Sequence, residues 1–152
     1  MKRIRVINKT RDSVLGARVE IVDRWWSRVR GFLGRPEPEQ GMGLLLSPCR
    51  AVHMIGVGFP LDVLFVNRAG VVVATYPELK PGSRTRYHIR AEYALEMRAG
   101  TIRASGTKEN DVLAWLPAED DAGASAANGR AHDAAKNGYQ GGRRAVLEVQ
   151  GR

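Results

Sequence analysis

The sequence has a single cysteine and no long apolar segment, and both absences restrict what the protein can be. Because Cys49 stands alone among 152 residues, the fold has no internal disulfide and must be held by packing. No segment approaches the roughly 20 apolar residues that a membrane-spanning helix requires. Residues 1–14 alternate charged and aliphatic side chains, unlike the apolar region of a secretion signal. We therefore expect a cytoplasmic protein without a membrane span.

Acidic residues are too few to balance the basic ones. The 24 Lys and Arg residues outnumber the 16 Asp and Glu residues, which gives a formal net charge of +8. Ten of the basic residues lie within residues 1–35, and a second group comprises Lys80, Arg84, Arg86 and Arg90. Such charge can attract nucleic acid, anionic lipid or an acidic partner. The simpler interpretation is that it keeps the protein soluble, because no RNA-binding aromatic motif or recognition helix accompanies it.

Large apolar residues are missing from one long segment near the end of the chain. In residues 118–142, 13 of 25 residues are Ala or Gly, and none is Val, Ile, Leu, Met, Phe or Trp. Such a segment cannot bury enough apolar surface to offset the entropy of ordering it. We therefore expect residues 117–152 to form a disordered tail. The rest divides into a basic N-terminal segment, residues 1–16, which contains the first strand, and a β-rich core domain, residues 17–116.

The start of the core predicts one strand and one short helix. Residues 17–22 alternate apolar and polar side chains, as a half-buried strand does. Asp23 then stands at a helix N-cap position, and Trp25, Val29 and Phe32 follow at i, i+4 and i+7. An apolar stripe at this spacing usually packs against the core, so we expect a short amphipathic helix with buried aromatic residues.

From residue 41 onward the sequence is typical of β structure. Residues 61–66 and 71–76 are apolar runs separated by four residues that end in Gly70, which predicts a β-hairpin. Further short strands are expected at residues 43–46, 52–54, 93–97 and 111–116. Short strands broken by turns predict a mainly β fold of β-rich α+β type. We expect a compact antiparallel sandwich or barrel-like domain with one short N-terminal helix.

Asp62 is the charged residue of the first hairpin strand. In an extended strand it shares one face with Leu64 and Val66, so its carboxylate lies on an apolar surface. A carboxylate that leaves water must be hydrogen-bonded or paired. We expect it to accept backbone N–H groups after the Phe59-Pro60 turn, or to meet an arginine such as Arg84 or Arg86. It is then either a structural group or a pocket carboxylate that binds or catalyses.

Cys49 and His53 are the residues that could form a nucleophilic thiol and imidazole pair. If residues 49–53 are extended, roughly 13 Å separate the two, and only a turn would bring them together. A buried inert thiol is the simpler interpretation, because free cysteine is among the most buried residue types. Together with Asp62 and His88 they are also competent metal ligands, but their spacing fits no recognised zinc pattern. We therefore expect neither a metal nor a cofactor.

Several motifs occur here in the order found in one family. They are Arg28-Val29-Arg30-Gly31-Phe32-Leu33-Gly34-Arg35, Gly41-Met42, residues 49–62 with Phe59-Pro60-Leu61-Asp62-Val63, and residues 91–100. Over residues 17–116 the chain resembles the bacterial and archaeal family called domain of unknown function 192. The resemblance implies a compact β-rich domain, sandwich or barrel-like, with a short helix near its start, and it implies no established activity.

The resemblance extends to single residues. Pro60 and Asp62 match the proline-hydrophobic-aspartate-valine signature of the family, and Cys49 with His53 matches a branch that carries both residues before it. Glu96 belongs to the Leu-Glu-x-x-Ala-Gly turn of the family. Many relatives have Trp-Met-x-Asn-Thr where this chain reads His-Met-Ile-Gly-Val from His53 onward, so no role of that Trp or Asn transfers.

Three functions are compatible with these residues. The first is a binding or accessory domain without enzymatic activity. Its polar pocket around Cys49, His53 and Asp62, beside Arg84 and Arg86, would receive a small anionic ligand or an acidic partner peptide, because arginine forks suit carboxylate and phosphate. The second is a small hydrolase or transferase that uses the thiol or a His/Asp pair. The third is a nucleic-acid-associated protein acting through the basic N-terminal region. We favour the first.

Overall fold

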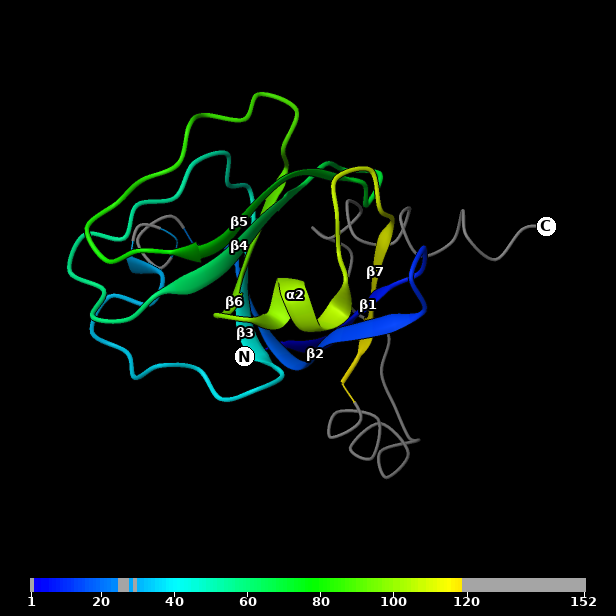
Figure 1. Cartoon of the computed structure of the whole chain (residues 1–152), viewed down its shortest axis with the longest axis horizontal. Coiled ribbons are helices and arrows are strands. Elements are labelled where there is room, and N and C mark those ends of the chain that lie inside the picture. The colour runs from blue at the N-terminus through cyan, green and yellow to red at the C-terminus, as the bar shows by residue number, and fades with distance from the viewer. Residues whose placement is uncertain (1, 25–27, 29, 119–152) are drawn as a thin grey trace, which may run out of the picture.

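One curled sheet of seven strands makes up the body of the protein (Figure 1). The computed structural model describes residues 2–24, 28 and 30–118. The elements are β1 (Arg3–Asn8), β2 (Ser13–Val22), β3 (Met42–Leu46), β4 (Leu61–Val66), β5 (Val72–Leu79), β6 (Tyr93–Arg98), α2 (Thr101–Ser105) and β7 (Leu113–Pro117). The strands are ordered β5-β4-β6-β3-β2-β1-β7. The prediction of a mainly β, barrel-like fold with little helix is confirmed.

The sheet is antiparallel at every neighbouring pair except one. Strands β2 and β3 run parallel, with Val19 opposite Gly43 and Ile21 opposite Leu45. A parallel pair needs a crossover connection of a dozen or more residues, and residues 23–41 supply it. The expectation of an antiparallel sheet is therefore corrected at this pair, because the long connection returns the chain to the same end of the sheet.

The two edge strands of the sheet approach each other at one end. Val72 N donates to Asp111 O at 2.9 Å, Asn110 N donates to Val72 O at 2.8 Å, and Leu113 N donates to Gly70 O at 2.8 Å. These bonds join the start of β5 to the segment that leads into β7, so the sheet forms a half-barrel. Helix α2 contacts both β2 and β5 and lies across the open side of the curl (Figure 1).

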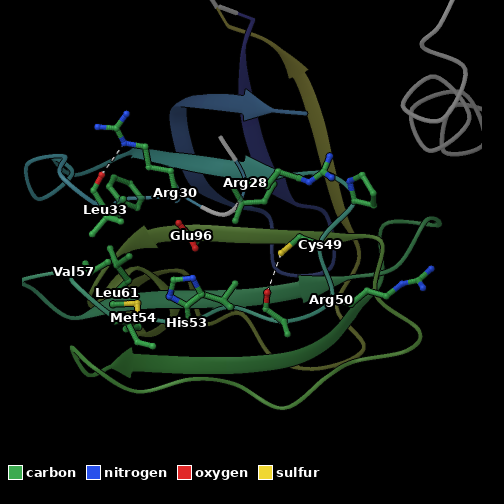
Figure 2. Close-up of a pocket in the computed structure, with 17 residues that line it drawn as sticks. Arg28, Arg30, Leu33, Cys49, Arg50, His53, Met54, Val57, Leu61 and Glu96 are labelled. Atoms are coloured by element: carbon green, nitrogen blue, oxygen red, sulfur yellow. Dashed lines mark hydrogen bonds between the residues drawn. The ribbon is translucent and has the colours of Figure 1, made fainter. Parts of the chain in front are cut away.

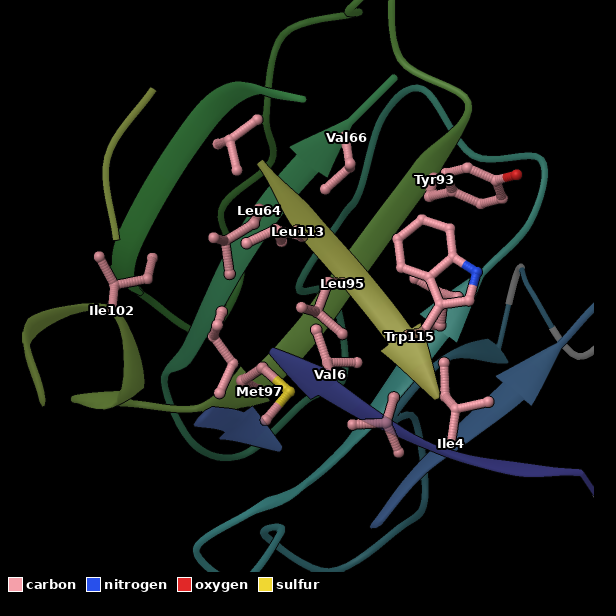
Figure 3. Packing of buried hydrophobic residues seen from close by; sticks show 14 residues of the cluster. Ile4, Val6, Leu64, Val66, Tyr93, Leu95, Met97, Ile102, Leu113 and Trp115 are labelled. Carbon is pink, nitrogen blue, oxygen red and sulfur yellow. The ribbon is translucent and has the colours of Figure 1, made fainter. Parts of the chain in front are cut away.

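Apolar side chains cover both faces of the sheet. We call the cluster enclosed by the curl the inner core; it includes Leu64, Val66, Leu95, Met97 and Trp115 (Figure 3). We call the cluster on the other face the outer core; it includes Phe32, Leu44, Met54, Leu61, Val63 and Phe65. Because β4 contributes alternate residues to the two cores, it is buried along its whole length. The long connections of the chain cover the outer core.

The predicted elements differ from the observed ones in two places, and two further predictions lie wholly or partly outside the described residues. Residues 52–54 do not form a strand; instead, an isolated bridge joins His53 to Arg84. Trp25 and Val29 of the predicted helix lie outside the described residues, as does the predicted tail from residue 119 onward. Helix α2 was not predicted, because its five residues are too few to show helical periodicity. Within the described residues no helix is long and apolar enough to cross a membrane.

Candidate functional site

A pocket of about 350 Å³ opens into the outer core (Figure 2). Its wall comes from Arg28 and residues 30–33, from residues 46–57 between β3 and β4, and from strands β4 and β6. The apolar part of the wall consists of Phe32, Leu33, Leu46, Val52, Met54, Ile55, Val57 and Leu61. Its charged and polar side chains are Arg28, Arg30, Cys49, Arg50, His53 and Glu96. An apolar cavity with a few polar groups is the usual form of a small-molecule site.

Backbone contacts hold the loops that form the pocket. His53 and Arg84 form an antiparallel bridge, flanked by bonds from Met54 N to Ser83 O at 2.7 Å and from Thr85 N to Val52 O at 2.9 Å. The pocket loop is therefore fastened to the loop that follows β5. Its position depends on the bridge and not on a regular strand.

Gly56 fixes the contact between two walls of the pocket. Its φ of 79° lies in the left-handed region, and a Cβ on it would come within 2.5 Å of Leu33 Cδ1. Only glycine fits both requirements without a shift of the neighbour. The two loops can therefore approach closely at the pocket wall.

Glu96 is a buried carboxylate on β6, and its side chain reaches the pocket. Its cross-strand neighbours are Leu44 and Val63, so the adjacent strands offer it no polar side chain. Only 4% of Glu96 is exposed, and Oε2 has no hydrogen-bond partner among the described residues. Gly31 lies against the carboxyl group, because a Cβ there would be 3.2 Å from Oε2. Figure 2 shows the carboxyl group pointing into the pocket.

Burial changes the protonation of Glu96. It raises the pKa of the carboxyl from its ordinary value of 4.5 to about 7, and the charge of Arg35 opposes this only in part. The Arg35 guanidinium is itself paired with Glu20 through bonds of 3.1 and 3.3 Å. Near neutral pH, Glu96 is therefore a mixture of neutral acid and carboxylate, able to donate or to accept a hydrogen bond.

Cys49 lines the pocket with a protonated thiol. Burial raises the pKa of the thiol to about 11, although its bond to Ala51 O lowers it in part. Sγ donates to that carbonyl at 3.2 Å. His53 also lines the pocket, but no hydrogen bond joins it to Cys49 among the described residues. Because the thiolate is the nucleophile, this arrangement does not activate the cysteine.

Three of the residues that line the pocket are arginines, and each donates to backbone carbonyl oxygens; for Arg30 this is Leu33 O at 3.3 Å. Arg28 Nη1 donates to Asp23 O at 2.6 Å and to Ser47 O at 3.1 Å, and Arg50 Nε donates to Ala91 O at 3.0 Å. Both side chains keep further N–H donors, since a guanidinium carries five. Glu96 is the acidic side chain among the described lining residues. The pocket therefore carries a net positive charge whether Glu96 is protonated or not.

Asp62 does not line this pocket, because it faces the opposite side of the sheet. It is fully buried beside the inner core, opposite Met97 on β6. Oδ1 accepts Glu78 N at 2.8 Å and Oδ2 accepts Ile102 N at 2.7 Å. The expectation that it accepts backbone N–H groups and shares a face with Leu64 is confirmed, although the donors come from β5 and α2.

The other sequence candidates lie at or beyond the pocket edge. Arg84 and Arg86 are exposed on the loop after β5, and the bridge to His53 brings Arg84 to the pocket loop. The His88 Nε2 atom lies 2.7 Å from the Tyr76 hydroxyl, and burial lowers the pKa of His88. No three His, Cys, Asp or Glu side chains come together as metal ligands in the described ranges.

The seven-stranded curled sheet with one short helix in the described residues places this chain among small, mainly β proteins of half-barrel form. This chain belongs to the family of domain of unknown function 192 (DUF192), described as an uncharacterised ACR, whose model matches residues 6–115. The resemblance in the sequence is confirmed, and it extends further towards the N-terminus than residue 17, into β1.

Known relatives agree with this assignment. The chain is 28% identical over 117 residues to a UPF0127 protein of Thermococcus sibiricus, covering 72% of this chain and 73% of the relative. It is 25% identical over 122 residues to a UPF0127 protein of Thermococcus kodakarensis, covering 76% and 75%.

Two solved structures are also similar. One, a candidate transcription regulator from Sinorhizobium meliloti, is 25% identical with a TM-score of 0.63, covering 75% of this chain and 92% of that one. The other, a protein of unknown function from Novosphingobium aromaticivorans, is 20% identical with a TM-score of 0.64, covering 74% and 84%. Because the second structure is only 20% identical, its similarity shows a shared fold and nothing about function.

Sequence reasoning missed Glu96 as a site residue. It entered only as part of the family turn, although a usable signal is present. In Tyr93–Arg98 a glutamate stands inside a strand whose neighbours are apolar on both faces. Glu96, like Asp62, is a carboxylate in an apolar strand, but the sequence does not determine which of the two finds backbone donors and which faces a pocket.

Proposed function

We propose that this protein is a non-enzymatic binding domain whose outer pocket receives a small organic anion with an apolar body. The supporting observation is the combination of an apolar wall with three arginines among the lining residues. Arg28, Arg30 and Arg50 attract a carboxylate or phosphate, while the wall residues take up the apolar part. Cys49 and His53 lie in the wall, and Arg84 reaches the edge through its bridge to His53.

The protonated thiol favours binding over thiol catalysis. A cysteine enzyme needs a thiolate or a base that takes the thiol proton, whereas the Cys49 thiol is protonated at neutral pH and donates to Ala51 O. Asp62 supports the fold in this proposal, because both of its oxygens accept backbone N–H groups.

The proposal is tested with three probes of similar shape and different charge: phenylacetate, phenylacetamide and 2-phenylethylamine. Isothermal titration calorimetry at pH 6 should show binding of the anion, weaker binding of the neutral amide, and none of the cation. R30Q should weaken the binding of phenylacetate, whereas R103Q removes an exposed arginine on α2 and should not. Equal affinities for the anion and the amide, or no binding of either, would contradict the proposal.

A second candidate, nucleic-acid binding through the basic N-terminal region, is favoured by the charge of residues 1–35 and by the Sinorhizobium meliloti structure. It requires an affinity for labelled duplex DNA whose logarithm falls steeply with the logarithm of salt concentration. Fluorescence anisotropy at low salt checks this directly. No change in anisotropy at low salt would exclude this candidate.

A further inference from the structure

The buried carboxyl of Glu96 has an oxygen without a partner, although it is in contact with the pocket. Oε2 finds no hydrogen bond within the described part of the chain, and 4% of the residue is exposed. A buried polar group without a partner costs free energy. Gly31 lies beside Oε2, since a Cβ there would be 3.2 Å from it, and its backbone supplies no hydrogen bond to this oxygen. Because Glu96 lines the pocket, its carboxyl group lies where a ligand in the pocket could supply the missing partner.

The groups around Glu96 determine the charge of that ligand. On the sheet, its neighbours Leu44 and Val63 are apolar. From the loops, Arg28, Arg30, Arg50, Cys49 and His53 line the same pocket, and Arg35 acts on Glu96 through its charge. Cys49 remains protonated, and Glu20 already pairs with Arg35. A cationic ligand would meet three arginines here, whereas an anion meets net positive charge, which is largest when Glu96 is neutral.

We propose that Glu96 meets the bound anion as a neutral acid whose Oε2–H donates to a ligand oxygen, so that binding takes up one proton from solvent. This inference rests on the proposed function and specifies how the pocket recognises its ligand. The proton stays on Oε2, the ligand keeps its negative charge, and no covalent bond forms or breaks. A carboxyl held neutral by an apolar environment can serve as a hydrogen-bond donor in this way. The raised pKa of Glu96 agrees with this geometry.

Proton uptake is measurable on the unaltered protein. The binding enthalpy of phenylacetate is measured by calorimetry at pH 8 in two buffers of equal ionic strength whose ionisation enthalpies differ. We expect an uptake close to one proton, and an affinity that falls about tenfold for each pH unit above 7. Phenylacetate binding without proton uptake at pH 8 would overturn the role of Glu96 while leaving the proposed function intact. If phenylacetate does not bind at all between pH 6 and pH 8, both the role of Glu96 and the proposed function are overturned.

Two variants separate Glu96 from the nearby imidazole. E96Q keeps an N–H donor without a titrating proton, so phenylacetate should bind it with the same affinity at pH 6 and pH 8 and without proton uptake. H53Q is the matched control, because His53 lines the same pocket; it should retain the proton uptake of the wild type. Loss of uptake in H53Q but not in E96Q would contradict the inference. Binding of 2-phenylethylamine that strengthens with pH would contradict it as well.

Discussion

At the scale of single residues, Asp62 and Glu96 show how two buried carboxylates on neighbouring strands receive different environments. Asp62 faces the inner core, where two backbone amides donate to it at 2.8 and 2.7 Å. Glu96 faces the outer core, where its Oε2 has no partner in the described ranges. The Asp62 carboxylate therefore stabilises the fold through its two backbone hydrogen bonds, whereas the Glu96 carboxyl keeps one oxygen without a partner in the described residues.

Replacement of Glu96 should change how stability depends on pH. Because the pKa of Glu96 in the folded protein is raised from 4.5 to about 7, the folded state holds a proton there that the unfolded state releases. Stability should therefore fall as pH rises through this range. E96Q removes this effect, so its stability relative to wild type should rise by roughly 3 kcal/mol between pH 4.5 and pH 8. Urea unfolding at several pH values measures it.

The control for this prediction is E39Q, which alters an exposed carboxylate. It should follow the wild-type pH dependence. A difference between E96Q and wild type that stays constant with pH would show that Glu96 titrates normally.

Cys49 should react slowly with alkylating reagents in the folded protein. Because burial raises its pKa from 9.0 to about 11, the thiolate fraction at pH 8 falls about 100-fold. Iodoacetamide labelling, followed by mass spectrometry, should therefore be at least about 100-fold slower in the native protein than in urea. Equal rates would restore the thiol-enzyme alternative.

At the scale of elements, α2 depends on a carboxylate from another strand. Five residues are too few for a helix to be stable alone, and the Asp62 carboxylate accepts the Ile102 amide at its first turn. D62N keeps one acceptor oxygen and turns an NH₂ group towards a backbone donor. We expect a loss of about 1–3 kcal/mol in unfolding free energy.

Hydrogen exchange of the Ile102 and Glu78 amides gives a local test of this prediction. Both should exchange faster in D62N, while amides of β1 should change only through the global loss of stability. Unchanged exchange at both amides would contradict the role of Asp62.

A second buried network joins the turn after β1 to the segment before β7. Asp111 Oδ2 accepts from Asn8 Nδ2 at 2.9 Å, from Arg11 Nε at 3.0 Å and from Lys108 N at 2.9 Å. Burial alone would raise the pKa of Asp111, but these bonds lower it to about 2. The stability that the carboxylate contributes is present above its ordinary pKa of 3.8 and is lost as pH falls through about 2.

D111A should reduce the free energy of unfolding by about 1–3 kcal/mol at neutral pH, because it leaves the Asn8 amide with fewer acceptors. Thermal unfolding at pH 7 and at low pH measures the effect, and the difference from wild type should shrink in acid. A difference that persists unchanged in acid would show that the loss is one of packing rather than of charge.

The elements also show which parts of the fold the sequence can predict. The alternation of Leu61–Val66 assigned its residues to the correct faces, since side-chain direction in a strand follows from the backbone alone. The bridge between His53 and Arg84 was not predictable, because it depends on tertiary contact between two loops. The same holds for Glu96, whose pocket is formed by segments distant in the chain.

At the scale of the whole molecule, the two faces of the half-barrel differ in what covers them. Its inner face is closed by α2 and filled with apolar residues, whereas its outer face is covered by loops that leave a pocket (Figures 1 and 2). The model of the DUF192 family covers the segments that form both faces, residues 6–115. Loops on a rigid sheet are a common place for binding residues.

The most direct test of the binding pocket is a map of amide chemical shifts on the ¹⁵N-labelled protein during titration with phenylacetate at pH 6. We predict that shift changes concentrate at Gly31, in residues 49–57 and at Glu96, and leave α2 and β7 unchanged. Changes confined to β1 and β2, or no changes at millimolar phenylacetate, would contradict the account.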